Sequence, residues 1–228
     1  MRLFRWLGLV ATVLLLTALA GPANAARVTH ESYTLTGVTA EATFFSEDGQ
    51  EPDVGIPRVL YAMGADATTV HRVPGAKPER TRQPAILAMG LIMPGIAPAD
   101  EPYQAELWCV TEDFTFTIAD DLSEAALQIP TCEAQVIVFD PQTGEEVPNG
   151  VTVTLAATTR WAATGPLETQ RSHSRYAVGG SWTMDLSRTS MRPATADITV
   201  SGLPSGTFEA STQEAVLQTL KVATFQHQ

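Results

Sequence analysis

The chain has 228 residues, of which 44% are hydrophobic and 17% are charged, and these proportions are typical of a folded soluble domain. Its 25 acidic and 14 basic residues give a formal net charge of −11. Nucleic acids and anionic lipid surfaces attract proteins with a surplus of Lys and Arg, so this balance argues against a general affinity for either. We expect no nucleic-acid partner.

The N-terminal residues 1–25 have the pattern of a cleaved secretory signal peptide. Arg2 and Arg5 precede an apolar run over residues 7–20, and Ala23-Asn24-Ala25 supplies small residues at both positions that a signal peptidase reads. The run is shorter than the roughly 20 residues that cross a bilayer, and no later apolar stretch is long enough. We therefore expect a mature chain of residues 26–228 without a membrane span. Its predicted location is extracellular, or periplasmic if an outer membrane is present.

The first predicted strand covers residues 38–44. Val38, Ala40, Ala42 and Phe44 alternate with polar residues. In an extended chain this alternation places one face in the core and the other in water, so the pattern predicts a half-buried strand.

Residues 46–106 differ in composition, because they hold 8 of the 15 prolines. This content predicts a loop-rich insertion. Within it, the apolar run Ala85–Met93 between Pro84 and Pro94 predicts a buried strand. The acidic residues 47–53 offer oxygen atoms that calcium prefers, although EF-hand spacing is absent, so a solvated loop is the simpler interpretation.

The same region carries a basic cluster, which consists of Arg72, Lys77, Arg80 and Arg82. A Pro- and Gly-containing loop with four positive charges would suit an anionic wall polymer or an acidic protein partner. The simpler interpretation is a solvated, protease-sensitive loop.

Cys109 and Cys132 are the two cysteines of the chain. An even count in an oxidising compartment predicts a disulfide, and closing a loop of this size stabilises a fold by roughly 3 kcal/mol. A redox or metal-binding pair is the alternative, but a Cys-x-x-Cys spacing is missing.

Further alternating patterns predict strands over residues 108–118, 151–161, 182–186 and 196–200. Residues 136–139 are apolar on both faces, which indicates a central strand, and Asp140-Pro141-Gln142-Thr143-Gly144 predicts a hairpin turn after it. Residues 120–127 fit either one helical turn or a turn that enters a strand. Residues 211–225 fit a helix with a capping box or a C-terminal strand, and we favour the strand.

These patterns together predict an all-β fold. Short strands separated by Gly and Pro indicate an antiparallel β-sandwich, Ig-like or jelly-roll-like, with one disulfide. The chain has no repeat or long linker, so residues 26–228 are expected to form a single domain with the Pro-rich insertion around residues 46–106.

Short elements of recognisable sequence run through the C-terminal half: Phe139-Asp140 with Thr143-Gly144, Arg160-Trp161-Ala162-Ala163-Thr164-Gly165-Pro166-Leu167, His173-Ser174-Arg175-Tyr176 and Arg192-Pro193-Ala194-Thr195-Ala196. With its Trp-x-x-Thr-Gly-Pro-Leu element and the Ser/Arg/Tyr-rich turn that follows, this half resembles uncharacterised secreted β-rich proteins of actinobacteria and similar bacteria. The resemblance implies a fold and no established activity.

Candidate metal ligands are scattered. His30, His71, His173 and His227 stand in no His-x-His or His-Glu-x-x-His pattern. A copper site would enlist His71 with Met63, Met89 and Met93, but core packing is the better account of these methionines. We expect no metal ion and no cofactor.

Candidate catalytic residues are equally sparse. Ser172-His173-Ser174 places hydroxyls beside an imidazole, yet neighbours in a strand point to opposite faces. Paired carboxylates occur at residues 100–101, 120–121 and 145–146, and surface solubility accounts for them. We expect a non-catalytic protein with a binding or structural role at the cell exterior, whose partner is a protein or an envelope polymer. The alternatives are a secreted hydrolase with a site assembled only in three dimensions, and a calcium- or copper-binding protein.

Overall fold

The computed structural model describes residues 30–45, 59–84, 89–94, 104–109, 111–140, 143, 145–147, 151–178, 180–203 and 206–227. The predicted signal peptide and the acidic residues 47–53 lie outside these ranges. The regular structure of the described residues is β-strand throughout. No helix among them has the length and apolar character needed to cross a membrane.

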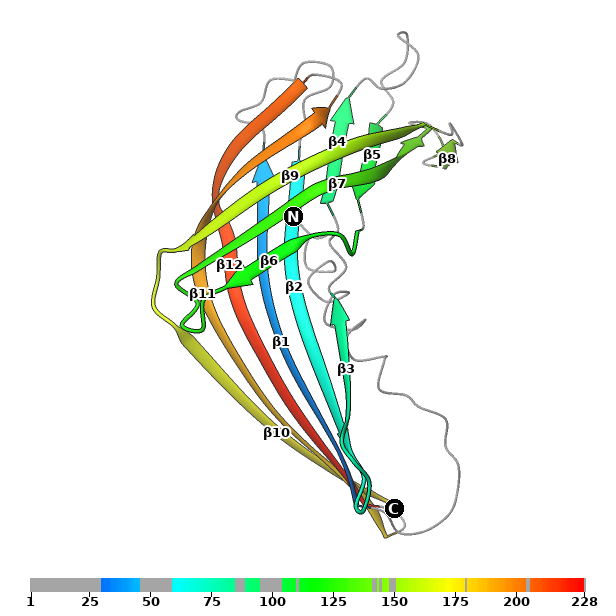
Figure 1. Ribbon diagram of the computed structural model, residues 1–228, viewed down its shortest axis with the longest axis vertical. Helices are drawn as coiled ribbons and strands as arrows, with labels where there is room; N and C mark the ends of the chain where they lie inside the picture. The colour runs from blue at the N-terminus through cyan, green and yellow to red at the C-terminus, as the bar shows by residue number, and fades with distance from the viewer. Residues whose placement is uncertain are drawn as a thin grey trace.

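The strands form one antiparallel sheet (Figure 1). They are β1 (His30–Phe45), β2 (Val59–Arg72), β3 (Glu79–Pro84), β4 (Met89–Pro94), β5 (Gln104–Cys109), β6 (Thr115–Ile118), β7 (Glu124–Phe139), β8 (Glu146–Val147), β9 (Thr152–Ala163), β10 (Glu168–Val178), β11 (Ser181–Leu203) and β12 (Gly206–His227).

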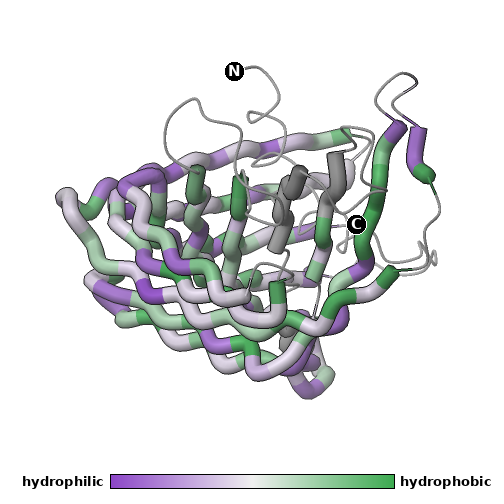
Figure 2. Tube along the Cα trace, turned by 90° about the horizontal axis from the view of Figure 1, so that it is seen from above, coloured by the Kyte–Doolittle hydropathy of each residue, from purple (hydrophilic) through white to green (hydrophobic). Residues whose placement is uncertain are grey.

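The pairing of these strands closes on itself. The order β1-β12-β11-β9-β7-β5-β4-β2 returns to β1, because β2 also pairs with β1. We call these strands, where they surround the core, the closed circuit. Viewed along the long axis of the molecule, the sheet curves around a common interior (Figure 2).

The core fills this interior. Its largest fully buried side chains are Trp161, Phe44, Leu60, Leu107, Leu122, Leu127, Leu155 and Leu217. The short strand β6 pairs with β7 and brings Phe116 against Gly64 of β2, where an added Cβ would lie 2.5 Å from the Phe116 ring. Close packing across the interior therefore depends on the missing side chain at residue 64.

Three irregularities keep the long strands facing the core, and one of them is a shift in the β11–β12 pairing between Val200 and Leu203. β7 shifts register between Ile129 and Cys132, and β12 shifts between Thr212 and Ala215. A bulge inserts a residue and reverses the alternation of side chains. On β7, buried positions are therefore odd-numbered up to Ile129 and even-numbered from Cys132.

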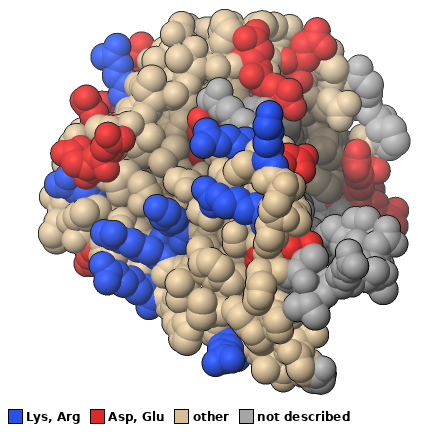
Figure 3. All heavy atoms as spheres, turned by 60° about the horizontal axis from the view of Figure 1, so that its bottom comes forward, with Lys and Arg blue, Asp and Glu red and all other residues tan. Residues whose placement is uncertain are grey.

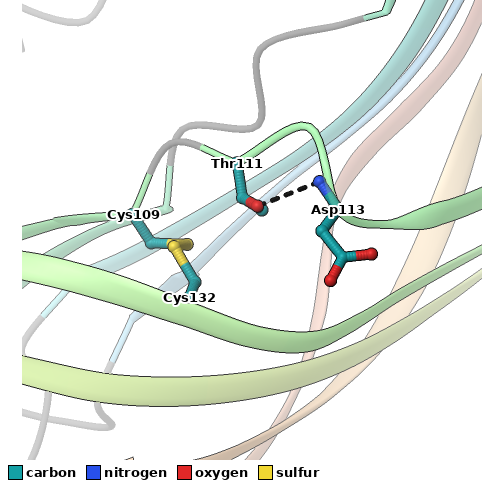
Figure 4. The surroundings of a disulfide bond; sticks show 4 residues. All are labelled: Cys109, Thr111, Asp113 and Cys132. Carbon is teal, nitrogen blue, oxygen red and sulfur yellow. Dashed lines mark hydrogen bonds between the residues drawn. A yellow bond between two sulfur atoms is a disulfide. The ribbon is translucent and has the colours of Figure 1, made fainter.

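The disulfide joins Cys109 at the end of β5 to Cys132 of β7, with 5.9 Å between the Cα atoms. Both cysteines are buried, at 0% and 4% exposure. Between the bond and β6 the chain turns, and the Asp113 amide donates to the Thr111 hydroxyl (Figure 4). The predicted disulfide is confirmed.

Below the closed circuit in Figure 1, the long strands continue as a curved single layer. It has the order β3-β2-β1-β12-β11-β10, and its strands are antiparallel neighbours. We call this layer the extension. Its two edge strands are β3 and β10, which pair on one side only among the described strands. Every residue of β10 is exposed.

The all-β, antiparallel prediction is confirmed, and so are the hairpin after residue 139 and the favoured C-terminal strand. Of the two alternatives for residues 120–127, the structure has the turn that enters a strand, β7. The two-sheet packing of a sandwich is not confirmed, because the strands belong to one sheet. The expected strand over residues 108–118 is wrong, since a turn divides it into β5 and β6. The patterns at residues 182–186 and 196–200 belong to one strand, β11.

The Pro-rich region contains more regular structure than expected. β2 and β3 form a hairpin in it, so the described part of residues 46–106 is largely strand. The strand predicted over residues 85–93 overlaps β4, while residues 85–88 lie outside the description. The expected turn around residues 172–176 is strand β10, and Tyr176 is 71% exposed.

Candidate anion-binding face

The register assigns each side chain of the extension to one of two faces, because residues directly opposite on antiparallel strands point to the same side. The inner face is the side that carries the core in the closed circuit, as Ala40 and Leu217 show. Ring contacts agree with the assignment. His30 and His227 stack on the inner face, with ring centroids 4.7 Å apart, and Tyr33 and His71 stack on the outer face at 4.2 Å.

Six exposed cationic residues of the extension lie on the inner face. We call this set the basic band, and its members are Arg72, Arg80, Arg171, Arg175, Arg188 and Lys221. The chain has 14 Lys and Arg residues in all. A large share of its positive charge therefore lies on one side of one sheet, although the protein as a whole is acidic.

Three members of the basic band lie in a single row of register partners across β12, β11 and β10. Lys221 is opposite Thr36 of β1, Arg188 is opposite Lys221, and Arg171 is opposite Arg188. The other members fall in the next two inner rows of register partners. Arg72 and Arg175 share the row of Ser32, since Arg72 is opposite Ser32 and Arg175 is aligned with it by way of Met184 and Phe225. Arg80 shares the row of Thr34, because both are opposite Val70. All six thus share three consecutive rows.

The outer face of the extension has the opposite charge. Its acidic residues are Glu31, Glu79, Glu168 and Asp185, and no described Lys or Arg lies on it. Asp185 accepts hydrogen bonds from Thr224 and Ser174, and Glu31 contacts His71 at 3.2 Å. In the view of Figure 3, Lys and Arg atoms form a band across the middle, whereas Asp and Glu atoms lie mainly towards the rim.

The arrangement of the basic band is unfavourable for the isolated protein. Like charges directly opposite each other on neighbouring strands destabilise a sheet, and Lys221, Arg188 and Arg171 occupy three adjacent strands. None of the six side chains forms an ion pair with a residue that the structure describes. The acidic residue nearest in register is Asp66, one inner row beyond the band.

A row of rings borders the basic band on the side away from the closed circuit. His30, His227 and Trp182 stand on three adjacent strands, and the centroids of the His227 and Trp182 rings are 5.8 Å apart. The guanidinium carbon of Arg175 lies 5.6 Å from the Trp182 centroid, within the range of a cation–π contact. The rings stack on one another across the strands.

The predicted basic cluster belongs to the β2–β3 hairpin. Arg72 ends β2, Lys77 lies in the turn, and Arg80 and Arg82 are on β3. The loop expected here is therefore a hairpin, and the structure brings Arg72 and Arg80 to the same face as four cations from β10, β11 and β12. Sequence reasoning missed those four. The spacing of Arg171 and Arg175, which share a strand face, was a signal for only two of them.

The residues considered for catalysis do not converge. His173 is on the inner face opposite Leu186, whereas Ser172 and Ser174 are on the outer face. There Ser172 hydrogen-bonds Ser187, and Ser174 donates to Asp185. The Ser–Asp contact and the imidazole thus lie on opposite sides of the sheet, a geometry that does not form a nucleophile–base pair.

The residues considered for metals are also apart. His71 and Met63 are eight positions apart on β2, which is about 26 Å in an extended strand. His71 contacts Glu31, and Met63 accepts from the Tyr61 hydroxyl. The described residues contain no cluster of three or more His, Cys, Asp or Glu side chains able to hold a metal ion. The side chains of Met89, Met93 and the acidic loop 47–53 lie outside the description.

A pair of titratable side chains lies apart from the basic band, on the outer side of the closed circuit. Burial raises the pKa of the Glu41 carboxyl, and the nearby Tyr61 hydroxyl partly opposes this rise. Burial and the nearby Glu41 raise the pKa of Tyr61 above its ordinary value. The pair lines no described site and bears on stability.

Comparison of the chain with models of protein families, with curated proteins and with solved structures finds no significant match.

Proposed function

We propose that this protein is a secreted, non-catalytic binding protein that engages an anionic partner at the cell exterior through the inner face of the extension. One observation carries the proposal: the described charges of the extension are largely sorted by face, with six cations and one acidic residue, Asp66, on the inner side and four acidic residues on the outer side. A random surface would mix the two signs.

Three further features support the proposal. The signal-like residues 1–25 and the buried disulfide suit a protein that works in an oxidising compartment. The repulsion within the row of Arg171, Arg188 and Lys221 is relieved when an anion binds. The net negative charge leaves little attraction for anions elsewhere, so binding is directed to this face.

The proposal is tested by fractionating a culture of the source organism and by sedimenting the purified mature protein with isolated cell envelopes. We expect the protein in the medium or periplasm, shortened by residues 1–25, and we expect it to co-sediment with envelopes at about 0.15 M salt and to be released at about 1 M, where charges are strongly screened. A protein that stays in the cytoplasm, or that fails to bind envelopes at the lower salt, would overturn the proposal.

A further inference from the structure

The basic band has the dimensions of a binding site for a chain rather than for a single ion. Between β3 and β10 there are five inter-strand steps, or about 24 Å, and the three rows that hold the cations span about 13 Å along the strands. A single phosphate or carboxylate contacts two or three side chains, so an isolated small anion leaves most of the band unused.

Small hydroxyl side chains lie in the middle of the face that carries the basic band, beside the apolar inner residues Val70, Ala223 and Phe225. Ser32, Thr34 and Thr36 of β1 occupy the inner positions between Arg72 and Arg80 on one side and the four cations of β10, β11 and β12 on the other. Hydroxyl groups donate hydrogen bonds to anionic oxygens without adding charge. A chain that crosses the strands thus meets cations at both ends and hydroxyl donors between them.

The kinds of side chain favour phosphate groups. Five of the six cations are arginines, whose planar guanidinium groups bind phosphate oxygens through two parallel hydrogen bonds. Adjacent members of the row Arg171–Arg188–Lys221 stand on neighbouring strands, which lie about 4.8 Å apart. Closely spaced charges of this kind match a polymer with a short, charged repeat.

Nucleic acid fits less well. Proteins that hold single-stranded nucleic acid combine a basic surface with aromatic side chains on which bases stack. The rings nearest to the basic band, His30, His227 and Trp182, stack on one another, and Arg175 lies near the Trp182 ring. These rings therefore do not offer a row of free faces to bases.

We propose that the basic band binds an extended polyol phosphate chain, a phosphodiester polymer without bases, which lies across the strands of the extension. This inference rests on the proposed function and names the class of its anionic partner. Each phosphodiester group meets a cation or a hydroxyl, and the acidic outer face keeps the chain on one side of the sheet.

The test measures binding of fluorescently labelled 1,3-glycerol phosphate oligomers of increasing length by fluorescence anisotropy, with the purified mature protein. Affinity is expected to rise with length until an oligomer reaches about 24 Å and to level off beyond it. Poly-L-glutamate, oligothymidylate and phosphatidylglycerol vesicles serve as carboxylate, nucleic-acid and membrane competitors, and each is expected to bind more weakly. Tighter binding of any of them, or affinity without length dependence, overturns the inference.

Two single variants localise the site. Arg188→Gln removes a cation from the centre of the row, and Arg160→Gln removes an exposed cation from β9 in the closed circuit. Each phosphate contact adds about one to the slope of log affinity against log salt, so Arg188→Gln is expected to lower that slope by about one and Arg160→Gln to leave it unchanged. Equal effects of the two variants contradict a local site.

The outcomes separate the two proposals. Binding to isolated envelopes without binding to glycerol phosphate oligomers rejects the polyol phosphate assignment and leaves the binding function in place. Absence of both rejects the function itself. Analytical ultracentrifugation without ligand provides a further check, because salt-sensitive self-association that Arg188→Gln abolishes would make a second copy the occupant of the basic band and overturn the polyol phosphate assignment.

Discussion

The indole N–H of Trp161 donates a hydrogen bond to the main-chain carbonyl oxygen of Glu41 over 3.1 Å, although the two residues are 120 positions apart in the chain. Trp161 belongs to β9 and Glu41 to β1, which do not pair with each other. The bond therefore ties two walls of the closed circuit together through its interior. Trp161 is 2% exposed, so its indole ring is shielded from water, while the hydrogen bond as a whole is partly buried.

Replacing Trp161 with Phe tests how much this hydrogen bond contributes to the free energy of unfolding. The substitution leaves the Glu41 carbonyl without its indole donor and reduces the volume of a well-packed core residue. We expect the free energy of unfolding to fall by about 1–3 kcal/mol, measured by urea denaturation. Trp182→Phe, in the half-buried ring row, is the matched control and should cost less. Equal losses from both variants would show that the interior hydrogen bond contributes nothing specific.

The disulfide can be assessed with the double variant Cys109→Ala/Cys132→Ala. Because the bond closes a loop of 23 positions, its removal is expected to lower the free energy of unfolding by about 3 kcal/mol. Reduction of the wild-type protein should give a similar loss, which separates the cross-link from the side-chain change. Unchanged stability in both experiments contradicts a structural role for the bond.

Thr159 offers a stabilising substitution. Its hydroxyl is buried in β9 and has no hydrogen-bond partner among the described residues, while the residue is 1% exposed. Valine has nearly the same shape and no polar atom to bury, so Thr159→Val should raise the free energy of unfolding by about 1 kcal/mol. Thr158→Val, at the exposed neighbouring position, should change it by less than about 0.5 kcal/mol. A loss of stability at residue 159 would mean that the hydroxyl has a partner in the folded protein.

Glu41 makes stability depend on pH in a defined direction. Since burial raises its pKa above the ordinary value of 4.5, the folded state binds more protons than the unfolded state between that value and the raised one. The contribution of Glu41 to stability therefore falls as pH rises through this window. Glu41→Gln should raise the melting temperature at pH 7, and the difference from wild type should shrink on acidification towards pH 4. A difference that grows on acidification has the wrong sign.

Alternation in the sequence predicted parts of β1, β9 and β11, because those parts have one buried face. In the first predicted strand Ala40, Ala42 and Phe44 are buried, and in the strand predicted over residues 151–161 Leu155, Ala157 and Trp161 are buried. The same rule failed for β10. Both faces of that strand are exposed, so its sequence carries no apolar alternation, and polar residues 172–176 suggested a turn.

Only part of the basic band could be predicted from the sequence. Arg72 and Arg80 stand close together in the chain and were identified as a cluster, whereas Lys221 lies more than 30 positions after Arg188 and reaches it through strand pairing. The register that aligns them follows from long-range pairing, which alternation within one strand does not specify. Net charge was also a poor guide, because it averages over two faces of opposite sign.

Among the described strands, β10 pairs on one side only, which leaves its other edge open. A long unpaired strand is a template on which a second copy can add its own. If two copies aligned their β10 strands antiparallel with complete overlap of residues 168–178, Arg171 of one would stand directly opposite Arg175 of the other, at both ends of the shared segment. The like charges at both ends of the shared segment would therefore oppose the pairing of two copies through β10.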